Sequence, residues 1–298
     1  MSRRLIASVK KYEFKYMDRK KIAIIGVGLI GGSMAISLRE KGFCSRIIGV
    51  DDNKEHQQKA LELKLVDEIA GLEDAVKGSD FIILSVPVDA TEDLLPRILD
   101  NIEHQTVMDV SSIKEVIIAA VKDHPKRRRF VATHPMWGTE YSGPEAAVKG
   151  AFIDKATVIC NKDESDKDAV ELVEMIYRTL GMRLLYMDAA AHDLHAAYVS
   201  HISHITSFAL ANTVLEKERE EDAIFEMASA GFESTVRLAK SNPAMWVPVF
   251  MQNRENVLDV LNEHISQLRK FKSCLEKENY EYLQELIENA NKIRRIIK

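Results

Sequence analysis

The sequence predicts an α/β protein in which an N-terminal, Rossmann-type doubly wound domain is followed by an all-α domain. Three observations lead to this prediction: a glycine-rich strand–turn–helix segment at residues 21–38, alternating strand and helix patterns as far as residue 188, and helical periodicity alone after that point. We therefore divide the 298 residues into a basic N-terminal extension (1–20), a dinucleotide-binding domain (21–188) and a helical domain (189–298).

The first element is a buried strand that leads through a tight glycine turn into a helix. Gly26, Gly28 and Gly31 stand at the spacing G-x-G-x-x-G. One glycine allows a backbone geometry that a side chain forbids, one lets a pyrophosphate approach the main chain, and one lets helix and strand pack closely. The helix that opens here points free N–H groups at the phosphates. We expect this turn, with Leu29 and Ile30 inside it, to bind a dinucleotide.

The second strand, residues 46–52, ends in an acidic residue that favours one dinucleotide. Asp51 follows Gly31 by 51 − 31 = 20 residues, and an acid at that distance accepts hydrogen bonds from the ribose hydroxyls of the adenine nucleotide. Its charge would also repel a 2′-phosphate, and no arginine follows it directly. The pattern therefore predicts NAD rather than NADP, with a plain nucleoside or flavin site as the alternative.

Five further apolar runs predict the remaining strands of a sheet that is buried on both faces. They cover residues 81–87, 106–110, 129–133, 155–160 and 182–187. A helix is expected near residues 167–180. Together with the first two strands, these runs predict a doubly wound sheet with extra strands.

Ligands of such sheets bind beyond the carboxyl ends of the strands, and chemically useful groups follow three of the predicted strands. The groups expected beside the cofactor are Ser85, Val86, Pro87 and Ser111. His134 follows a third strand, and an imidazole of ordinary pKa near 6.5 can take the proton of a hydroxyl that is being oxidised. Ser112 can orient the same hydroxyl. The alternatives are a structural histidine at 134 and a helix N-cap at 112.

The helical part holds a second group of candidate residues. Four of the nine histidines lie in HDLHAAYVSHISH, and His201 and His204 share one helix face. They can bind an anionic substrate, or they can serve an interface or a helix cap. No metal is expected, because the segment lacks H-E-x-x-H and a nearby cysteine. Arg237 lies on a mostly apolar helix and suits either a substrate carboxylate or a structural acid, and Trp246 suits a pocket wall or the core.

The composition excludes several classes of function. A net charge of −5 with 29% charged residues gives no overall field for nucleic acid, and the apolar runs are too short to span a membrane. Three scattered cysteines form no disulfide framework or metal motif, which favours a reducing, cytoplasmic location. Residues 1–20 lack the apolar core of a secretory signal. The long helices favour a homodimer, with a self-sufficient helical bundle as the alternative.

The motifs taken together resemble the prephenate dehydrogenase family. The resemblance extends over nearly the whole chain after residue 20 and rests on GVGLIGGS, GVDDN, LSVPV, DVSSIK, HPMWGTEYSG, HDLHAAYVSHISH and VRLAKSNPAMW in that order. It implies a Rossmann domain, a helical dimerisation domain and an active site between them. The implied activity is the NAD-dependent oxidative decarboxylation of prephenate to 4-hydroxyphenylpyruvate in tyrosine biosynthesis.

The resemblance also implies roles for particular residues. His134 corresponds to the histidine that polarises or deprotonates the C4 hydroxyl of the substrate, and Ser112 to the serine that hydrogen-bonds it. Arg237 corresponds to an arginine that binds a substrate carboxylate. The other residues that we assign to the substrate pocket are Ser200, His201, His204, Glu140 and Trp246.

The sequence also departs from the family pattern and leaves rival functions open. Trp137, Glu233 and Ser203 replace residues that are common in the family, and no mutase or regulatory part is expected beside the two domains. Arogenate dehydrogenase is the nearest rival function. A β-hydroxyacid dehydrogenase is less favoured because Ser200 and His201 occupy the region where those enzymes use a lysine. A non-catalytic NAD-binding protein would have no need of His134, Ser112 and Arg237 together.

Overall fold

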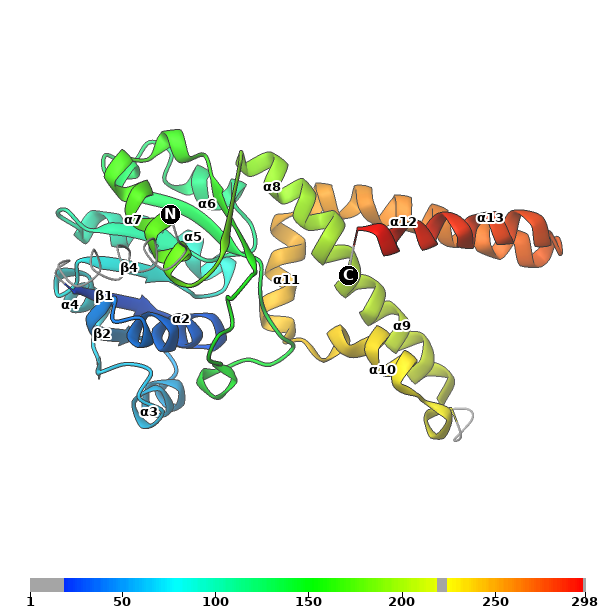
Figure 1. Cartoon of the computed structure of the whole chain (residues 1–298), viewed down its shortest axis with the longest axis horizontal. Coiled ribbons are helices and arrows are strands. Elements are labelled where there is room, and N and C mark those ends of the chain that lie inside the picture. The colour runs from blue at the N-terminus through cyan, green and yellow to red at the C-terminus, as the bar shows by residue number, and fades with distance from the viewer. Residues whose placement is uncertain (1–18, 219–223, 297–298) are drawn as a thin grey trace, which may run out of the picture.

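The N-terminal part of the chain forms one eight-stranded sheet with helices on both faces (Figure 1). The computed structural model describes residues 19–218 and 224–296, so all but the last two residues of the basic extension lie outside it. The strand order is β3-β2-β1-β4-β5-β6-β7-β8. The strands are β1 (Lys20–Ile25), β2 (Cys44–Val50), β3 (Glu68–Ile69), β4 (Phe81–Leu84), β5 (Thr106–Asp109), β6 (Phe130–Pro135), β7 (Ala156–Cys160) and β8 (Arg183–Met187).

The order of the first six strands is that of a doubly wound sheet, so the predicted α/β class is confirmed. All strand pairs are parallel except β6 and β7, which run antiparallel. The order in which strands are added to the sheet reverses at β1: β2 and β3 lie on one side of it, and β4 lies on the other. Strands β1 and β4 are parallel neighbours, with Ile25 paired with Leu84. A ligand-binding crevice is expected beyond the carboxyl ends of these two strands. The two-residue strand β3 is an addition that the apolar runs did not predict.

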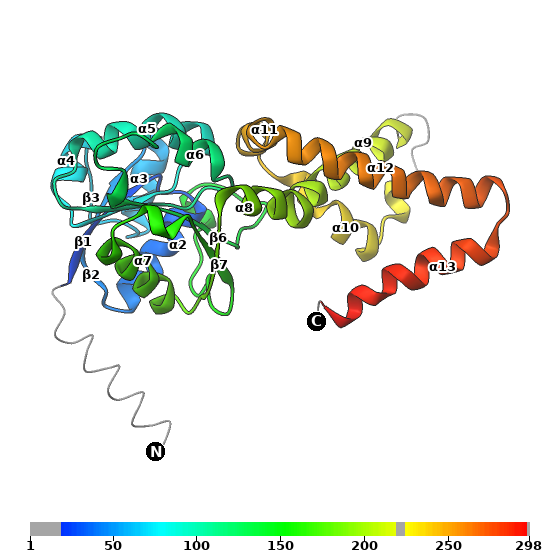
Figure 2. The same ribbon diagram turned by 90° about the horizontal axis from the view of Figure 1, so that it is seen from above.

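Helices on the two faces of the sheet bury separate apolar cores. Side chains of α2 and α7 join the core on one face, and side chains of α4, α5 and α6 join the core on the other (Figure 2). Strands β4 and β5 are buried along their whole length, as their continuous apolar sequences require. The helices are α2 (Leu29–Glu40), α3 (Lys54–Glu62), α4 (Leu72–Lys77), α5 (Val88–Asn101), α6 (Glu115–Ala120) and α7 (Lys167–Thr179).

The rest of the described chain is helical and extends away from the sheet (Figures 1 and 2). It begins at α8, where the Asp188 side chain caps the helix by accepting a hydrogen bond of 2.7 Å from the Ala191 N–H. A π-helical segment (Ala197–His201) joins α8 to α9. The helices are α8 (Ala189–Ala196), α9 (Ile202–Glu218), α10 (Ala230–Val236), α11 (Pro243–Gln252), α12 (Arg254–Glu276) and α13 (Tyr280–Asn291).

Helical periodicity runs through residues 244–277, but the structure divides this helical stretch at one point. The stretch is two helices, α11 and α12, separated at Asn253, whose φ of −106° and ψ of 29° leave the helical region. The Asn253 amide bonds to the Asp193 carbonyl (2.8 Å) and to His201 Nδ1 (3.1 Å). These tertiary hydrogen bonds, which periodicity cannot detect, accompany the break.

Helix α11 docks the helical part onto the sheet. Trp246 and Val249 belong to the same buried apolar cluster as Leu95 of α5, and Gln252 donates a hydrogen bond of 2.9 Å to Glu92. Beyond this contact, α12 runs outward and α13 turns back (Figure 2). Within residues 19–218 and 224–296, no helix is both long enough and apolar enough to cross a membrane.

Candidate active site

The glycine turn lies between β1 and α2, and each of its three glycines meets a different constraint. Gly26 has a φ of +92°, and a Cβ there would lie 2.3 Å from the Ser85 carbonyl oxygen. A Cβ on Gly31 would lie 2.1 Å from the Gly26 carbonyl oxygen. A Cβ on Gly28 would meet no atom closer than the Gly143 nitrogen at 4.0 Å. Gly28 thus leaves free space at the N-terminus of α2, where a pyrophosphate would approach.

Asp51 follows β2 and reaches the glycine turn. Its Oδ2 accepts a hydrogen bond of 3.1 Å from the Val27 N–H, and its Oδ1 accepts one of 3.0 Å from the Asn53 N–H. His56 Nδ1 lies 3.5 Å from the same Oδ1. The carboxylate is therefore fixed beside the turn, at the place where a fingerprint acid would meet a ribose.

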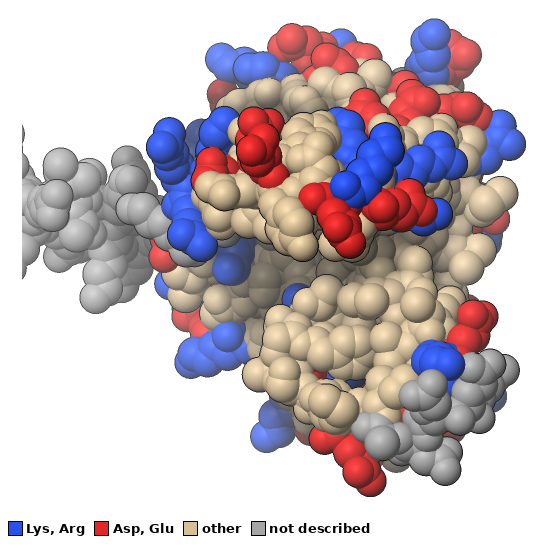
Figure 3. Space-filling model, turned by 90° about the vertical axis from the view of Figure 1, so that its right-hand side faces the viewer, with Lys and Arg blue, Asp and Glu red and all other residues tan. Residues whose placement is uncertain are grey.

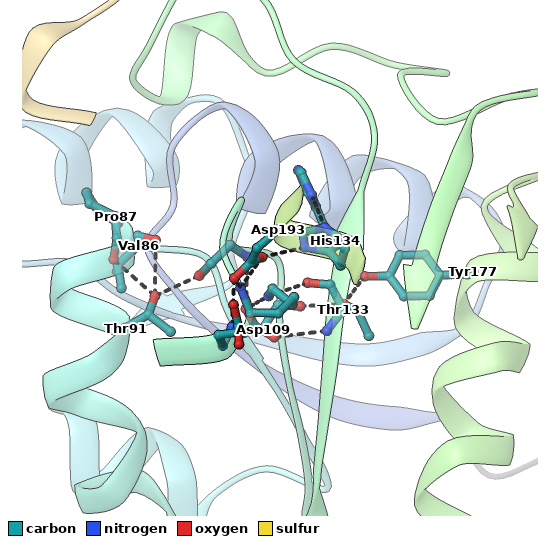
Figure 4. Close-up of polar contacts among 12 residues, drawn as sticks. Val86, Pro87, Thr91, Asp109, Thr133, His134, Tyr177 and Asp193 are labelled. Atoms are coloured by element: carbon teal, nitrogen blue, oxygen red, sulfur yellow. Dashed lines mark hydrogen bonds and ion pairs between the residues drawn. The ribbon is translucent and has the colours of Figure 1, made fainter. Parts of the chain in front are cut away.

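His134 lies at the carboxyl end of β6 and is held by residues of α8 (Figure 4). His134 Nδ1 lies 2.9 Å from His192 Nε2, and His192 Nδ1 lies 2.7 Å from Asp193 Oδ1. The exposed fractions of these three residues are 9%, 2% and 1%. The imidazole that the sequence singled out is therefore the outer member of a buried chain of polar groups.

The surroundings of His134 keep its imidazole neutral. Burial lowers the pKa of His134 well below the ordinary 6.5, and the nearby His192, Lys114 and His201 lower it further. A neutral imidazole carries a lone pair on one ring nitrogen. His134 is thus in the protonation state that a general base requires at neutral pH.

A buried ion pair fixes the loop that precedes α6. Lys114 Nζ contacts an Asp109 carboxylate oxygen and donates a hydrogen bond of 2.7 Å to the Thr133 carbonyl, and both charged side chains are fully buried. Asp109 also accepts hydrogen bonds of 3.0 Å from the N–H groups of Thr133 and Ser111 (Figure 4). These contacts tie the end of β5 to β6 immediately before His134.

The cofactor side of the site is tied to the same loop. Ser111 donates a hydrogen bond of 3.0 Å to Thr91, and the Thr91 hydroxyl reaches the carbonyls of Val86 (3.3 Å) and Pro87 (3.0 Å) (Figure 4). Ser85, the remaining residue predicted at this end of β4, lies against Gly26. The structure therefore brings these predicted cofactor contacts together at one sheet edge.

Ser112 does not cap a helix, which was the second role considered for it beside the orientation of a substrate hydroxyl. The first N–H groups of α6, those of Lys114 and Glu115, donate instead to the Asp193 carboxylate at 2.8 and 2.9 Å. Ser112 is half-buried, and its hydroxyl has no hydrogen-bond partner among residues 19–218 and 224–296. It is thus free to bond a substrate.

Two of the predicted substrate residues pack on a third. The ring of His204 stacks on Trp246 with centroids 3.4 Å apart, and the ring of His201 meets Trp246 edge-on at 6.0 Å. Ser200 belongs to the same π-helical segment as His201, and its carbonyl oxygen lies 3.0 Å from His204 Nδ1 in a hydrogen bond. His201 Nε2 and Trp246 Nε1 are buried and have no hydrogen-bond partner within the described part of the chain.

Burial also controls the charge of these two histidines. It lowers the pKa of His201 to about 4, although the nearby Asp193 acts in the opposite direction. It lowers the pKa of His204 as well, with the charge of Arg237 contributing. The pair is therefore neutral at pH 7 and does not supply the positive charge that an anionic substrate needs.

Arg237 and Glu140 form an ion pair that joins the two parts of the chain. Arg237 Nη1 lies 2.7 Å from Glu140 Oε2, and the arginine side chain is 48% exposed against 12% for the glutamate. Arg237 follows α10, and Glu140 lies in the loop after β6. The structural acid expected as one partner for Arg237 is thus present. In the part of the chain that the structure describes, the other guanidinium nitrogens have no partner and could bond a carboxylate.

The matches to family models agree with this two-part arrangement. Residues 34–186 match the nucleotide-binding domain of prephenate dehydrogenase, and residues 188–289 match the dimerization domain of prephenate dehydrogenase. The chain belongs to the prephenate dehydrogenase family. The resemblance drawn from the sequence motifs is therefore confirmed.

Similar proteins of this family span nearly the whole chain. The prephenate dehydrogenase of Bacillus subtilis is 30% identical over 277 residues, which cover 92% of this chain and 75% of that protein. Prephenate dehydrogenase from Aquifex aeolicus, solved with hydroxyphenyl propionate and NAD+, is 30% identical with a TM-score of 0.86 and covers 95% of this chain and 100% of that one. Arogenate dehydrogenase from Synechocystis is 25% identical with a TM-score of 0.71, covering 93% and 100%.

The site of this prephenate dehydrogenase family member includes residues that were not predicted from its sequence. These are His192, Asp193 and Asn253 around the imidazoles, and the Asp109–Lys114 pair below them. The adjacent His192 and Asp193 in the motif HDLH were a signal in the sequence that an acid orients a histidine of this segment. In the described part of the chain, no group of three or more His, Cys, Asp or Glu side chains is placed to hold a metal ion.

Proposed function

We propose that this chain catalyses the NAD-dependent oxidative decarboxylation of prephenate to 4-hydroxyphenylpyruvate, a step of tyrosine biosynthesis. The observation that carries the proposal is the buried imidazole of His134, bonded to His192 at the sheet edge that holds the glycine turn. Family membership across both parts of the chain and 30% identity to the Bacillus subtilis prephenate dehydrogenase support the choice of substrate.

The residues at the sheet edge fit NAD. The open space at Gly28 admits a pyrophosphate, and the carboxylate of Asp51 suits ribose hydroxyls and opposes a 2′-phosphate. When bound, NAD supplies the electron acceptor, because its nicotinamide takes the hydride from C4 of the substrate. The residues that we assign to its binding are Gly26, Gly28, Leu29, Ile30, Gly31, Asp51, Ser85, Val86, Pro87 and Ser111.

His134 and Ser112 act on the C4 hydroxyl. Ser112 donates or accepts a hydrogen bond to this hydroxyl and orients it, while the neutral His134 accepts its proton. Loss of the ring carboxylate as CO2 then makes the ring aromatic, so the reaction is driven toward product. His134 is the catalytic base, and the low pKa that burial gives it keeps it ready for this role.

Arg237 supplies the positive charge for the dianionic substrate. Within the described residues, its guanidinium bonds only Glu140, and the remaining donors suit a substrate carboxylate. Nε2 of His201 and Nε1 of Trp246 have no hydrogen-bond partner among residues 19–218 and 224–296, and a buried donor left unpaired costs roughly 1–3 kcal/mol. These two donors therefore support a substrate acceptor nearby. His204 and Ser200 complete this wall of the pocket.

The test is NADH formation by the purified chain with prephenate and, separately, with arogenate and simple hydroxyacids. The proposal expects the largest kcat/KM with prephenate and NAD+. A preference for arogenate would assign the nearest rival activity, which the 25% identity to Synechocystis arogenate dehydrogenase keeps open. No turnover with any of these substrates would contradict catalytic function of this type.

We also propose that the chain forms a homodimer through its helical part. The match of residues 188–289 to a dimerization domain supports it. The helical part exposes many large apolar side chains, and the view onto its far end shows broad uncharged surface beside a hollow (Figure 3). They include Leu215, Leu258, Leu268, Leu275, Tyr280, Tyr282, Ile287 and Ile293. Light scattering after gel filtration should give twice the chain mass of 33.7 kDa, and a monomer at micromolar concentration would refute the dimer.

A cytoplasmic location is the remaining part of the proposal. Cys44, Cys160 and Cys274 are all buried thiols that form no disulfide, which agrees with a reducing compartment. Burial raises the pKa of the Cys160 thiol to about 12, so this thiol is unreactive. Fractionation of cells that express the full chain tests the location directly.

A further inference from the structure

A chain of three buried side chains ends at the proposed catalytic base. His134 Nδ1 lies 2.9 Å from His192 Nε2, and His192 Nδ1 lies 2.7 Å from Asp193 Oδ1. We propose that His192 and Asp193 are positioning residues that hold His134 in the tautomer with its free lone pair on Nε2. This inference rests on the proposed function, because it gives His134 the role of base.

The position of each proton follows from the fixed end of the chain. Asp193 accepts hydrogen bonds from the backbone N–H groups of Lys114 (2.8 and 3.1 Å) and Glu115 (2.9 Å), and this arrangement suits an ionised carboxylate. A carboxylate only accepts, so the proton between it and His192 must be on His192 Nδ1. Neutral His192 then has its lone pair on Nε2 and can only accept from His134 Nδ1. The lone pair of His134 is left on Nε2.

Asp193 is anchored on both sides. Its carboxylate meets the start of α6 in the sheet domain, and its carbonyl accepts a hydrogen bond of 2.8 Å from the Asn253 amide at the start of α12. The residue is 1% exposed, so water does not compete for these contacts. The orientation of His134 therefore depends on how the helical part sits on the sheet domain.

This arrangement also accommodates the proton that the reaction releases. The substrate O–H bond breaks and its proton bonds to His134 Nε2. The O–H electron pair forms the C4 carbonyl as the C4–H bond gives up its hydride to the nicotinamide that bound NAD would supply. The positive charge on the His134 ring strengthens its Nδ1–H hydrogen bond to His192, and the Asp193 carboxylate opposes that charge from behind. His192 acts through His134, whose Nδ1 it contacts.

Two substitutions at His192 separate orientation from bulk. His192→Gln keeps an oxygen that can accept from His134 Nδ1–H and an amide that can donate to Asp193, whereas His192→Phe keeps only the ring. We expect His192→Phe to lower kcat roughly 100-fold, within the range of general-base effects, and His192→Gln to stay within about tenfold of the unmodified chain. The KM for NAD+ should change little in both. His195→Gln, on the exposed face of the same helix, is the matched control and should leave kcat unchanged.

Asp193→Asn tests the tautomer with almost no change of shape. An amide that donates to His192 Nδ1 forces the His192 proton to Nε2, which then donates to His134 Nδ1 and moves the His134 proton to Nε2. The base is then blocked, and kcat should fall roughly 100-fold while substrate KM changes little. The triad aspartate of serine proteases shows a loss of the same origin. A kcat of Asp193→Asn close to that of the unmodified chain would overturn the proposal.

The tautomer can also be measured directly in the unmodified chain. Two-bond 15N–1H correlation spectra of the full chain labelled with 15N-histidine should show the His134 proton on Nδ1, with assignment from the His134→Asn spectrum. A His134 proton on Nε2 would refute the inference, whatever the variants do. This spectrum needs no substrate, so failure of the inference is distinguishable from failure of the proposed activity, which is judged from NADH formation.

Discussion

Gly28→Ala and Gly31→Ala should damage the protein in different ways, although both remove a glycine from the same turn. The Gly31 Cβ would lie 2.1 Å from the Gly26 carbonyl oxygen, a backbone atom that cannot rotate away. Overpacking in a well-packed core typically costs about 1–3 kcal/mol, and a contact this short belongs at the upper end. The Gly28 Cβ would meet nothing closer than 4.0 Å, and its φ of −76° suits alanine.

The expected magnitudes follow from this geometry. Gly31→Ala should lose about 3 kcal/mol of unfolding free energy and on the order of 5 °C in Tm. Gly28→Ala should keep the Tm of the unmodified chain without cofactor, but its methyl group occupies the space of the pyrophosphate. If affinity for NAD+ falls tenfold, stabilisation by a cofactor concentration of 100 times the original Kd drops from about 2.7 to about 1.4 kcal/mol.

Thermal unfolding with and without NAD+ measures both effects in one assay. In Gly28→Ala, the NAD-induced rise in Tm should be at most about half of the rise in the unmodified chain. Isothermal titration should give the weaker Kd directly. An unchanged NAD-induced shift in Gly28→Ala would refute the assignment of this turn to the pyrophosphate. A Gly31→Ala protein as stable as the parent would refute the packing argument.

Two further predictions concern charge in the substrate pocket. Arg237→Gln should raise the KM for prephenate at least tenfold with a smaller change in kcat, because it removes a ground-state contact to a carboxylate, and an unchanged KM would show a structural arginine. Lowering the pH should destabilise the folded chain between pH 6.5 and about 4, because the unfolded chain binds a proton at His201 that the folded chain, with a pKa of about 4, does not. Protonation of His201 alone lowers the free energy of unfolding by about 3 kcal/mol over that interval, and His134 acts in the same direction. A denaturation midpoint that stays constant from pH 7 to pH 4.5 would contradict this prediction.

The glycine spacing and the buried strands could be predicted from sequence because their causes are local. Gly26 needs its positive φ, and β4 needs a continuous apolar run since both of its faces are covered. The position of His134 after a strand followed from the same rule about the ends of parallel strands. Each of these features shows itself in a pattern of a few consecutive residues.

The contacts that complete the site could not be predicted because they join distant segments. Lys114 N–H meets the Asp193 carboxylate across 79 positions of sequence, and Arg237 meets Glu140 across 97. The break at Asn253 arises in the same way, from hydrogen bonds to α8 and to the π-helical segment. Nothing in the local pattern separates these polar residues from solvated ones until the helical part is docked on the sheet.

The turnover number of His134→Asn with prephenate and NAD+ shows whether His134 is the catalytic base. Asparagine retains a hydrogen-bonding side chain of similar polarity but cannot accept the proton of the C4 hydroxyl. We expect kcat to fall by roughly two orders of magnitude or more, while the Kd for NAD+ measured by titration stays the same. A His134→Asn protein that forms NADH from prephenate at nearly the parental rate would contradict that role.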